Sequence, residues 1–146
     1  MISEKPLQKF LNELKINSGI SRSILITEDG LLITRDDENS NSNDLMQNME
    51  IGAITAGILS MSERLVDLLT KQKLNQILIK TELDSEENGL TTIITLVYNN
   101  IILLVFFPSK LNVGLILFEI EETKQKISDY LKNQKGDFIL NPESVL

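Results

Sequence analysis

The residue types that carry out most enzymatic chemistry are missing from this chain. Its 146 residues include no cysteine and no histidine. Disulfides, thiolate metal sites, cysteine nucleophiles and Ser-His-Asp arrangements are therefore excluded, and the commonest general base and zinc ligand is lacking. Any catalysis would have to rest on Asp, Glu, Lys, Tyr, Ser or Thr, and no nucleophile site is recognisable among them. We therefore expect a protein that is not an enzyme and that carries no cofactor.

Two local patterns resemble ligand sites but lack essential parts. Gly52 and Gly57 have the spacing of the glycines in a phosphate-binding loop, but Ile58-Leu59 follow where that motif needs Lys and Ser or Thr. The acidic segment Asp36-Asp37-Glu38, together with Asp44, could attract a divalent cation. Its spacing matches no calcium loop, so a solvated acidic turn explains it better. We expect neither nucleotide nor metal binding.

Charged side chains offer one further candidate. The arginines are Arg22, Arg35 and Arg64, and an arginine can stabilise the transition state of GTP hydrolysis in a neighbouring protein. Arg64, on the polar side of a predicted helix, is the best placed, although a surface ion pair is the commoner role. The pair Glu121-Glu122 lies beside lysines three and four residues away, which is typical of a solvent-facing helix and not of an acid–base dyad.

The overall charge limits the partners. The formal net charge is −7 and the isoelectric point is near 4.6, so the surface repels nucleic acid and anionic lipid. The longest apolar run, Ile101–Phe107, is far too short to span a bilayer, and the first residues do not resemble a signal peptide. We expect a cytoplasmic protein without direct membrane insertion.

The first third of the chain predicts a helix followed by a hairpin. Apolar residues at i, i+3, i+4 and i+7 indicate an amphipathic helix over residues 4–16, which Gly19 can end. Strands are predicted at Ser23–Glu28 and Leu31–Arg35, and Asp29-Gly30 between them is typical of a tight turn. The polar stretch Asp36–Asn43 is predicted to be a loop.

A long helix is predicted from about Leu45 to Lys71. It has two faces that could be buried. One is an apolar stripe, which consists of Ile51, Ile54, Ile58, Met61, Leu65, Leu68 and Leu69. The other carries small side chains, Ala53, Ala56, Gly57 and Ser60, which would allow another backbone to come close.

Three strands and a helix are predicted after it. Leu74–Leu83 alternates like a half-exposed edge strand, and Leu90–Tyr98 follows after a turn. Ile101–Phe107 is apolar without alternation, so it is the best candidate for a central strand. Leu111–Leu131 fits a helix better than a strand, because the polar run after Ile120 is helix-prone. We expect Gly136 to end it.

The predicted order is α-β-β-α-β-β-β-α, which is an α/β (α+β) fold. Hairpins dominate, so the five-stranded sheet should be antiparallel with helices on both faces. We expect one domain over residues 1–133 and a C-terminal tail over residues 134–146.

Four segments resemble the Roadblock (dynein light-chain type) family, which regulates Ras-like GTPases. The opening hairpin Ser23–Ile33, the helix Ile51–Leu69 with Ser62-Glu63-Arg64-Leu65, the strand Leu74–Ile79 and the segment Asn112-Val113-Gly114-Leu115 are each similar to it. The resemblance extends over residues 4–132. It implies that the central helix lies on one sheet face, with the first and last helices on the other.

The resemblance also implies a homodimer, or a dimer with a paralogue, in which the third strands pair and the central helices cross a two-fold axis. The edge-like third strand and the two-faced helix point the same way. The dimer residues that we predict are Ala53, Ala56, Gly57, Ser60, Arg64, Ile77 and Ile79. The implied function is a non-catalytic scaffold or regulator that binds a Ras-like small GTPase.

Two other classes of protein remain as alternatives. A profilin-like or PAS-like sensory module would bind a small ligand in an apolar cavity under the sheet and would be a monomer. A longin-like trafficking module would share the layered fold but use a different surface.

Overall fold

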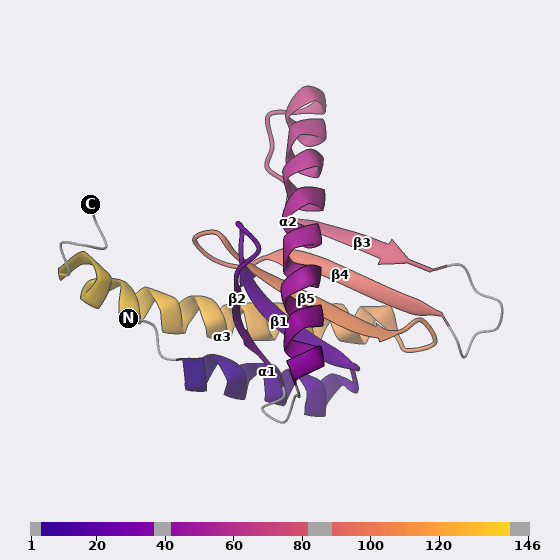
Figure 1. Ribbon diagram of the computed structural model, residues 1–146, viewed down its shortest axis with the longest axis horizontal. Coiled ribbons are helices and arrows are strands. Elements are labelled where there is room, and N and C mark those ends of the chain that lie inside the picture. Colours follow the sequence, from indigo (N-terminus) through magenta and orange to yellow (C-terminus); the bar gives the residue numbers. More distant parts are fainter. Residues whose placement is uncertain (1–3, 37–41, 82–88, 141–146) are drawn as a thin grey trace.

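The computed structural model describes residues 4–36, 42–81 and 89–140. They form three helices and five strands, in the predicted order (Figure 1). The helices are α1 (Glu4–Ser18), α2 (Ser42–Leu69) and α3 (Val113–Leu140). The strands are β1 (Arg22–Thr27), β2 (Leu32–Arg35), β3 (Gln76–Lys80), β4 (Leu90–Leu96) and β5 (Ile101–Pro108).

The strands form one antiparallel sheet in the order β2-β1-β5-β4-β3. The apolar segment Ile101–Phe107 lies in its central strand, β5, as predicted, because a strand covered on both faces needs no polar positions. Strand β3 is at one edge, also as predicted, and β2 is at the other. Both edge strands are short, which limits the backbone that they leave unpaired.

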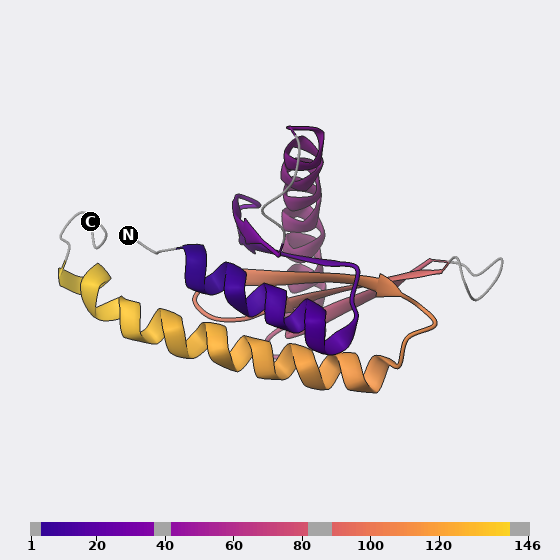
Figure 2. The ribbon, with the colours of Figure 1, turned by 90° about the horizontal axis from the view of Figure 1, so that it is seen from below.

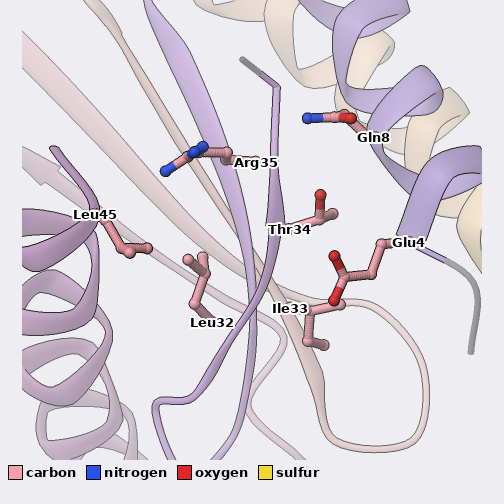
Figure 3. A pocket seen from close by; sticks show the side chains of 7 residues that line it. All are labelled: Glu4, Gln8, Leu32, Ile33, Thr34, Arg35 and Leu45. Carbon is pink, nitrogen blue, oxygen red and sulfur yellow. The ribbon is translucent and has the colours of Figure 1, made fainter. Parts of the chain in front are cut away.

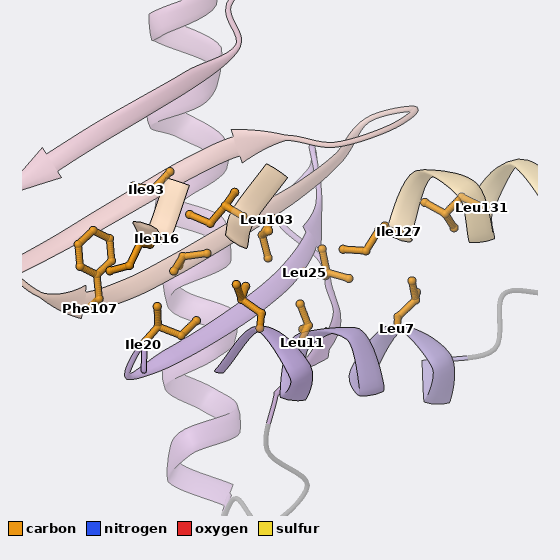
Figure 4. Close-up of a cluster of buried hydrophobic side chains, with 13 residues drawn as sticks. Leu7, Leu11, Ile20, Leu25, Ile93, Leu103, Phe107, Ile116, Ile127 and Leu131 are labelled. Atoms are coloured by element: carbon orange, nitrogen blue, oxygen red, sulfur yellow. The ribbon is translucent and has the colours of Figure 1, made fainter. Parts of the chain in front are cut away.

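Helices cover both faces of the sheet. Helices α1 and α3 lie side by side on one face and α2 lies on the other (Figure 2). Side chains alternate along each strand, so each face has its own core. On the α1 and α3 side, Leu25, Leu103 and Phe107 belong to one cluster with Leu11 and Ile116 (Figure 4). This larger cluster holds the last helix in place along the sheet.

The smaller core lies between the sheet and α2. It contains Ile24, Ile26, Ile94, Ile102 and Leu104 from the strands, whereas Leu59 is the fully buried apolar residue that α2 contributes. Helix α2 therefore rests on the sheet through a narrow contact. Its C-terminal end extends past the sheet (Figure 1).

Several predicted boundaries were wrong by a few residues or more. Helix α3 continues through Gly136 to Leu140, since a glycine inside a helix costs only about 1 kcal/mol and does not by itself end it. The choice of helix over strand for Leu111–Leu131 is confirmed, because residues 113–131 lie within α3. Residue 133, after which the C-terminal tail is predicted to begin, also lies within α3. The turn predicted over residues 84–89 lies outside the described residues except for Gly89.

Asp36 corrects the prediction of a solvated acidic loop. Its carboxylate is buried, accepts a hydrogen bond from the backbone N–H of Ser23 at 3.0 Å, and lies 3.9 Å from the ammonium of Lys15. From the end of β2, Asp36 thereby satisfies a buried backbone donor of β1. Sequence alone did not show this, because the partner lies across the hairpin.

Candidate functional site

Helix α2 carries the largest exposed group of apolar side chains. On the side that points away from the sheet, Met61 is 75% exposed and Leu68 is 85% exposed. The same side also exposes Met46, Met49, Ile54 and Leu65. We call this surface the outward face of α2. Isolated apolar side chains are common on protein surfaces, but a contiguous group of large ones indicates an interaction site.

The side of α2 that touches the sheet mixes small, polar and apolar residues. Among the residues of the helix whose burial is described, Asn48, Gly52, Thr55 and Leu59 are buried, and they follow one another every three or four positions. Of the predicted apolar stripe, only Ile51 and Ile58 pack against the core on this side. The other five residues of the stripe, including Ile54, are exposed.

The glycine at position 52 explains this orientation. A Cβ atom on Gly30, in the tight turn after β1, would lie 2.7 Å from the carbonyl oxygen of Gly52. Real Cβ atoms almost never come so close, so both backbones can touch only because both residues are glycine. Gly30 also has a φ of +91°, which favours glycine. The close approach presses this turn of α2 to the hairpin and directs the opposite face to solvent.

The N-terminal part of α2 is held by Arg22. Its guanidinium donates hydrogen bonds to the side-chain oxygens of Gln47 and Asn48, and it lies 5.4 Å from the ring centre of Phe106. Asn48 is buried, so the hydrogen bond satisfies a polar group that has left water. This arginine, considered from the sequence only as a candidate source of transition-state charge, is therefore an anchor of the helix.

Strand β3 presents a second exposed feature beside the sheet core. It pairs with β4 along one side, with Ile77 opposite Ile94 and Ile79 opposite Thr92. Ile77 packs against the α2-side core, whereas Ile79 is 40% exposed. Leu78 points to the α3 side and is also exposed. An edge strand with three adjacent apolar residues can accept another strand.

The predicted dimer residues divide between these two features. Ala53, Gly57, Ser60 and Arg64 are all exposed on the outward face of α2, and Ala56 is half-buried beside them. Ile77 and Ile79 lie on β3, on the sheet face that α2 covers. Arg64 lies where the apolar and polar parts of the helix surface meet, one turn from Met61 and Leu68 and one turn from Ser60 and Asp67. Met46 and Met49, which were not predicted, continue the same face toward the start of α2.

The other candidates from the sequence have structural explanations. The segment Gly52–Gly57 lies inside α2, so its amides are used by the helix and do not form a phosphate loop. Within the described residues, no three acidic side chains are placed to hold a metal ion. Lys124 pairs with Glu121 at 3.5 Å on α3, as expected for a helix surface.

Open hollows lined by described residues border α2, and two of them bear on the ligand-binding alternative. One, of about 380 Å³, is lined by Glu4, Gln8, Leu32, Ile33, Thr34, Arg35 and Leu45, between α1, β2 and α2 (Figure 3). The other, of about 500 Å³, is lined by Glu28, Asp29, Ala56, Gly57, Leu59, Ser60 and Glu63, between the first hairpin and α2. Charged side chains rim both hollows, unlike the apolar cavity that a small-ligand sensor of the profilin or PAS type would need.

None of the described helices combines the length and apolarity needed to cross a bilayer.

The layered fold and the edge strand agree with a match to one family model. Residues 7–107 match the model described as "Roadblock/LC7 domain". The chain belongs to the Roadblock/LC7 domain family. The family resemblance inferred from the sequence is thus confirmed. Among curated protein sequences, none matches the chain significantly.

Solved Roadblock/LC7 structures share the fold of this chain. MglB from Myxococcus xanthus has a TM-score of 0.72 and 16% identity, and the match covers 87% of this chain and 95% of that one. A structure described as MglB with a tetrameric arrangement has a TM-score of 0.72 and 11% identity, and the match covers 91% of this chain and 95% of that one. The Roadblock/LC7 domain from Streptomyces avermitilis has a TM-score of 0.69 and 14% identity, and the match covers 86% of this chain and 97% of that one. At such low identity these likenesses show the fold alone.

Proposed function

We propose that this Roadblock/LC7 chain forms a homodimer and that the dimer binds a Ras-like small GTPase, as a scaffold or a regulator, without chemistry of its own. The observation that carries the proposal is the outward face of α2. A helix that extends past its sheet and exposes several large apolar residues is stable in water only when something covers it. A second copy is the simplest cover, because two-fold pairs are the commonest soluble oligomers.

The free edge of β3 supports the same assembly. Two copies related by a two-fold axis can join their β3 strands into one antiparallel sheet, and Ile77 and Ile79 of each copy would then meet at the join. The match to a structure described as tetrameric MglB favours self-association in proteins of this fold. The alternative, a dimer with a paralogue, would use the same two elements.

The GTPase partner is proposed from the family resemblance and from what the composition excludes. A net charge of −7 disfavours nucleic acid, and a chain without Cys or His lacks the usual catalytic groups. If the dimer stimulates GTP hydrolysis, we propose that it does so indirectly, by holding the switch loops of the GTPase in a hydrolysis-competent arrangement. In this indirect mechanism Arg64 has no catalytic role, because it lies in or beside the interface of the proposed homodimer.

Mass measurement and GTP turnover test the proposal together. Light scattering after size exclusion should give twice the chain mass at micromolar concentration, and a larger complex after a GTP-loaded Ras-like protein is added. Turnover of GTP is then measured with and without the chain. Single copies, or the absence of a complex with every Ras-like GTPase tried, would contradict the proposal. A copurifying small ligand would favour the sensory alternative.

A further inference from the structure

The outward face of α2 has the same kind of residue at equal distances before and after Gly57. Met46 and Leu68 are equally far from Gly57, and so are Met49 and Leu65. All four are large, apolar and exposed. When two helices lie antiparallel about a two-fold axis, positions equally far from the axis face each other. With the axis at Gly57, each methionine of one copy would therefore meet a leucine of the other.

The residues closest to Gly57 suit a crossing of two helices. A Cβ atom on Gly57 would have no neighbour within 4 Å, so this point of the surface is open. One turn away, the large Met61 would face the small Ala53, and the large Ile54 would face the small Ser60. Large side chains opposite small ones allow a close approach, whereas the Met–Leu pairs farther out fill a wider gap. Two helices that cross at an angle have this shape, close at the centre and apart at the ends.

The charged residues on this face select the orientation. Glu50 and Arg64 are exposed and equally far from Gly57. In the antiparallel arrangement, Glu50 of each copy would face Arg64 of the other, which gives two ion pairs per dimer. A parallel arrangement would instead place Glu50 against Glu50 and Arg64 against Arg64. With the axis at residue 59, Glu50 would instead face Leu68 and Arg64 would face Ile54, so both charges would lie opposite apolar residues.

From these three observations, we propose that reciprocal Glu50–Arg64 ion pairs, in antiparallel register about Gly57, decide which chain the outward face of α2 accepts as its partner. The inference rests on the homodimer proposed above and adds its register and its selectivity. A paralogue without an acidic and a basic residue at the matching positions would leave these charges unpaired. The pairs thus favour the chain's own copy as the partner.

Charge reversal tests the register. Glu50→Arg gives a chain with two arginines on the face, and Arg64→Glu gives one with two glutamates, so each variant should repel its own copy. For each variant alone, the dimer dissociation constant should rise about tenfold, because two exposed pairs become repulsive in each dimer. An equimolar mixture should regain wild-type affinity, because both contacts between the two variants are again of opposite charge. The double variant, Glu50→Arg with Arg64→Glu, should also regain it.

The measurement is the concentration dependence of the mass in analytical ultracentrifugation, with an affinity tag on one variant to capture the mixed dimer. Glu63→Arg is the matched control, since Glu63 is exposed on α2 but lies beside the first hairpin and off the outward face. It should leave the dimer unchanged. If wild type dimerises but neither single variant is weakened, or if the mixture shows no recovery, the register is wrong and the homodimer stands. A monomeric wild type would overturn both.

A cysteine gives a second test that does not depend on charge. The chain contains no cysteine, so Gly57→Cys introduces one thiol per copy, at the proposed axis. Two thiols on the axis of a close crossing lie within the range that a disulfide can span. Mild oxidation should convert this variant to a covalent dimer, whereas Glu63→Cys should stay single. Equal cross-linking of both variants, or none at position 57, would overturn an axis at Gly57.

Discussion

The backbones of Gly30 and Gly52 lie so close together that a Cβ atom on Gly30 would come within 2.7 Å of the Gly52 carbonyl oxygen. This contact joins the first hairpin to the middle of α2. It decides which side of the helix meets the sheet, and so which side remains for a partner.

Gly52→Ala should therefore destabilise the fold. The added methyl group points at the Gly30 backbone, which cannot move aside as a flexible side chain can. We expect a loss of about 1–3 kcal/mol in the free energy of unfolding, as for other overpacked sites. Urea denaturation followed by circular dichroism measures this. Gly114→Ala on α3 is the control, because its Cβ atom would meet only the side chain of Asn112. Equal stability of Gly52→Ala and wild type would show that the two backbones can separate at little cost.

Asp36→Ala should destabilise the end of the first hairpin. The change removes the acceptor for the buried Ser23 N–H, which lies 3.0 Å from the carboxylate oxygen. A buried donor without a partner costs about 1–3 kcal/mol. The midpoint of urea denaturation should fall accordingly, and Asp36→Asn, which keeps an acceptor oxygen, should lose less. Asp29→Ala, in the exposed turn at the other end of the hairpin, should change stability little. A midpoint for Asp36→Ala equal to that of wild type would mean that water replaces the carboxylate.

Leu65→Asp should dissociate the proposed homodimer without unfolding the chain. Leu65 is 58% exposed on the outward face of α2, so a single copy tolerates a polar residue there. Between two copies, the change removes about 1.5–3 kcal/mol of apolar burial from each side, and the dissociation constant should rise at least about a hundredfold. Light scattering gives the mass and circular dichroism the fold. Leu115→Asp is the control, because Leu115 is similarly exposed but lies on α3. If Leu65→Asp still dimerises at the concentrations at which wild type does, the contact between the two copies lies elsewhere.

The two edge strands should differ in hydrogen exchange. In the proposed homodimer β3 is paired on both sides, whereas β2 keeps a free edge. Amide protons of Gln76–Lys80 should therefore exchange slowly in wild type and faster in Leu65→Asp, which serves as the single-copy reference. Protection in β2 should be the same in both proteins. Mass spectrometry of peptic peptides resolves the two strands. If β3 exchanges equally fast in both proteins, the two copies do not join through this edge.

The sequence by itself determined the elements and their order. The Asp29-Gly30 turn, the unbroken apolar strand Ile101–Phe107 and the edge character of β3 were all predicted, because each depends on local backbone preference or on which faces of a strand are apolar. The family followed from these elements in order. Boundaries were less certain: α3 passes Gly136, since a single glycine lowers helix stability without ending it.

Only the tertiary structure decided which side of α2 faces outward. A period of 3.6 residues shows that a helix has distinct faces, but it does not show which one lies on the sheet. The sequence left open which face of the helix the sheet would bury. Most of the apolar stripe is exposed, because the contact between Gly30 and Gly52 brings the side with Asn48, Thr55 and Leu59 onto the sheet. That contact joins residues far apart in the sequence. Likewise, the roles of Asp36 and Arg22 became visible only when the hairpin and α2 were placed together.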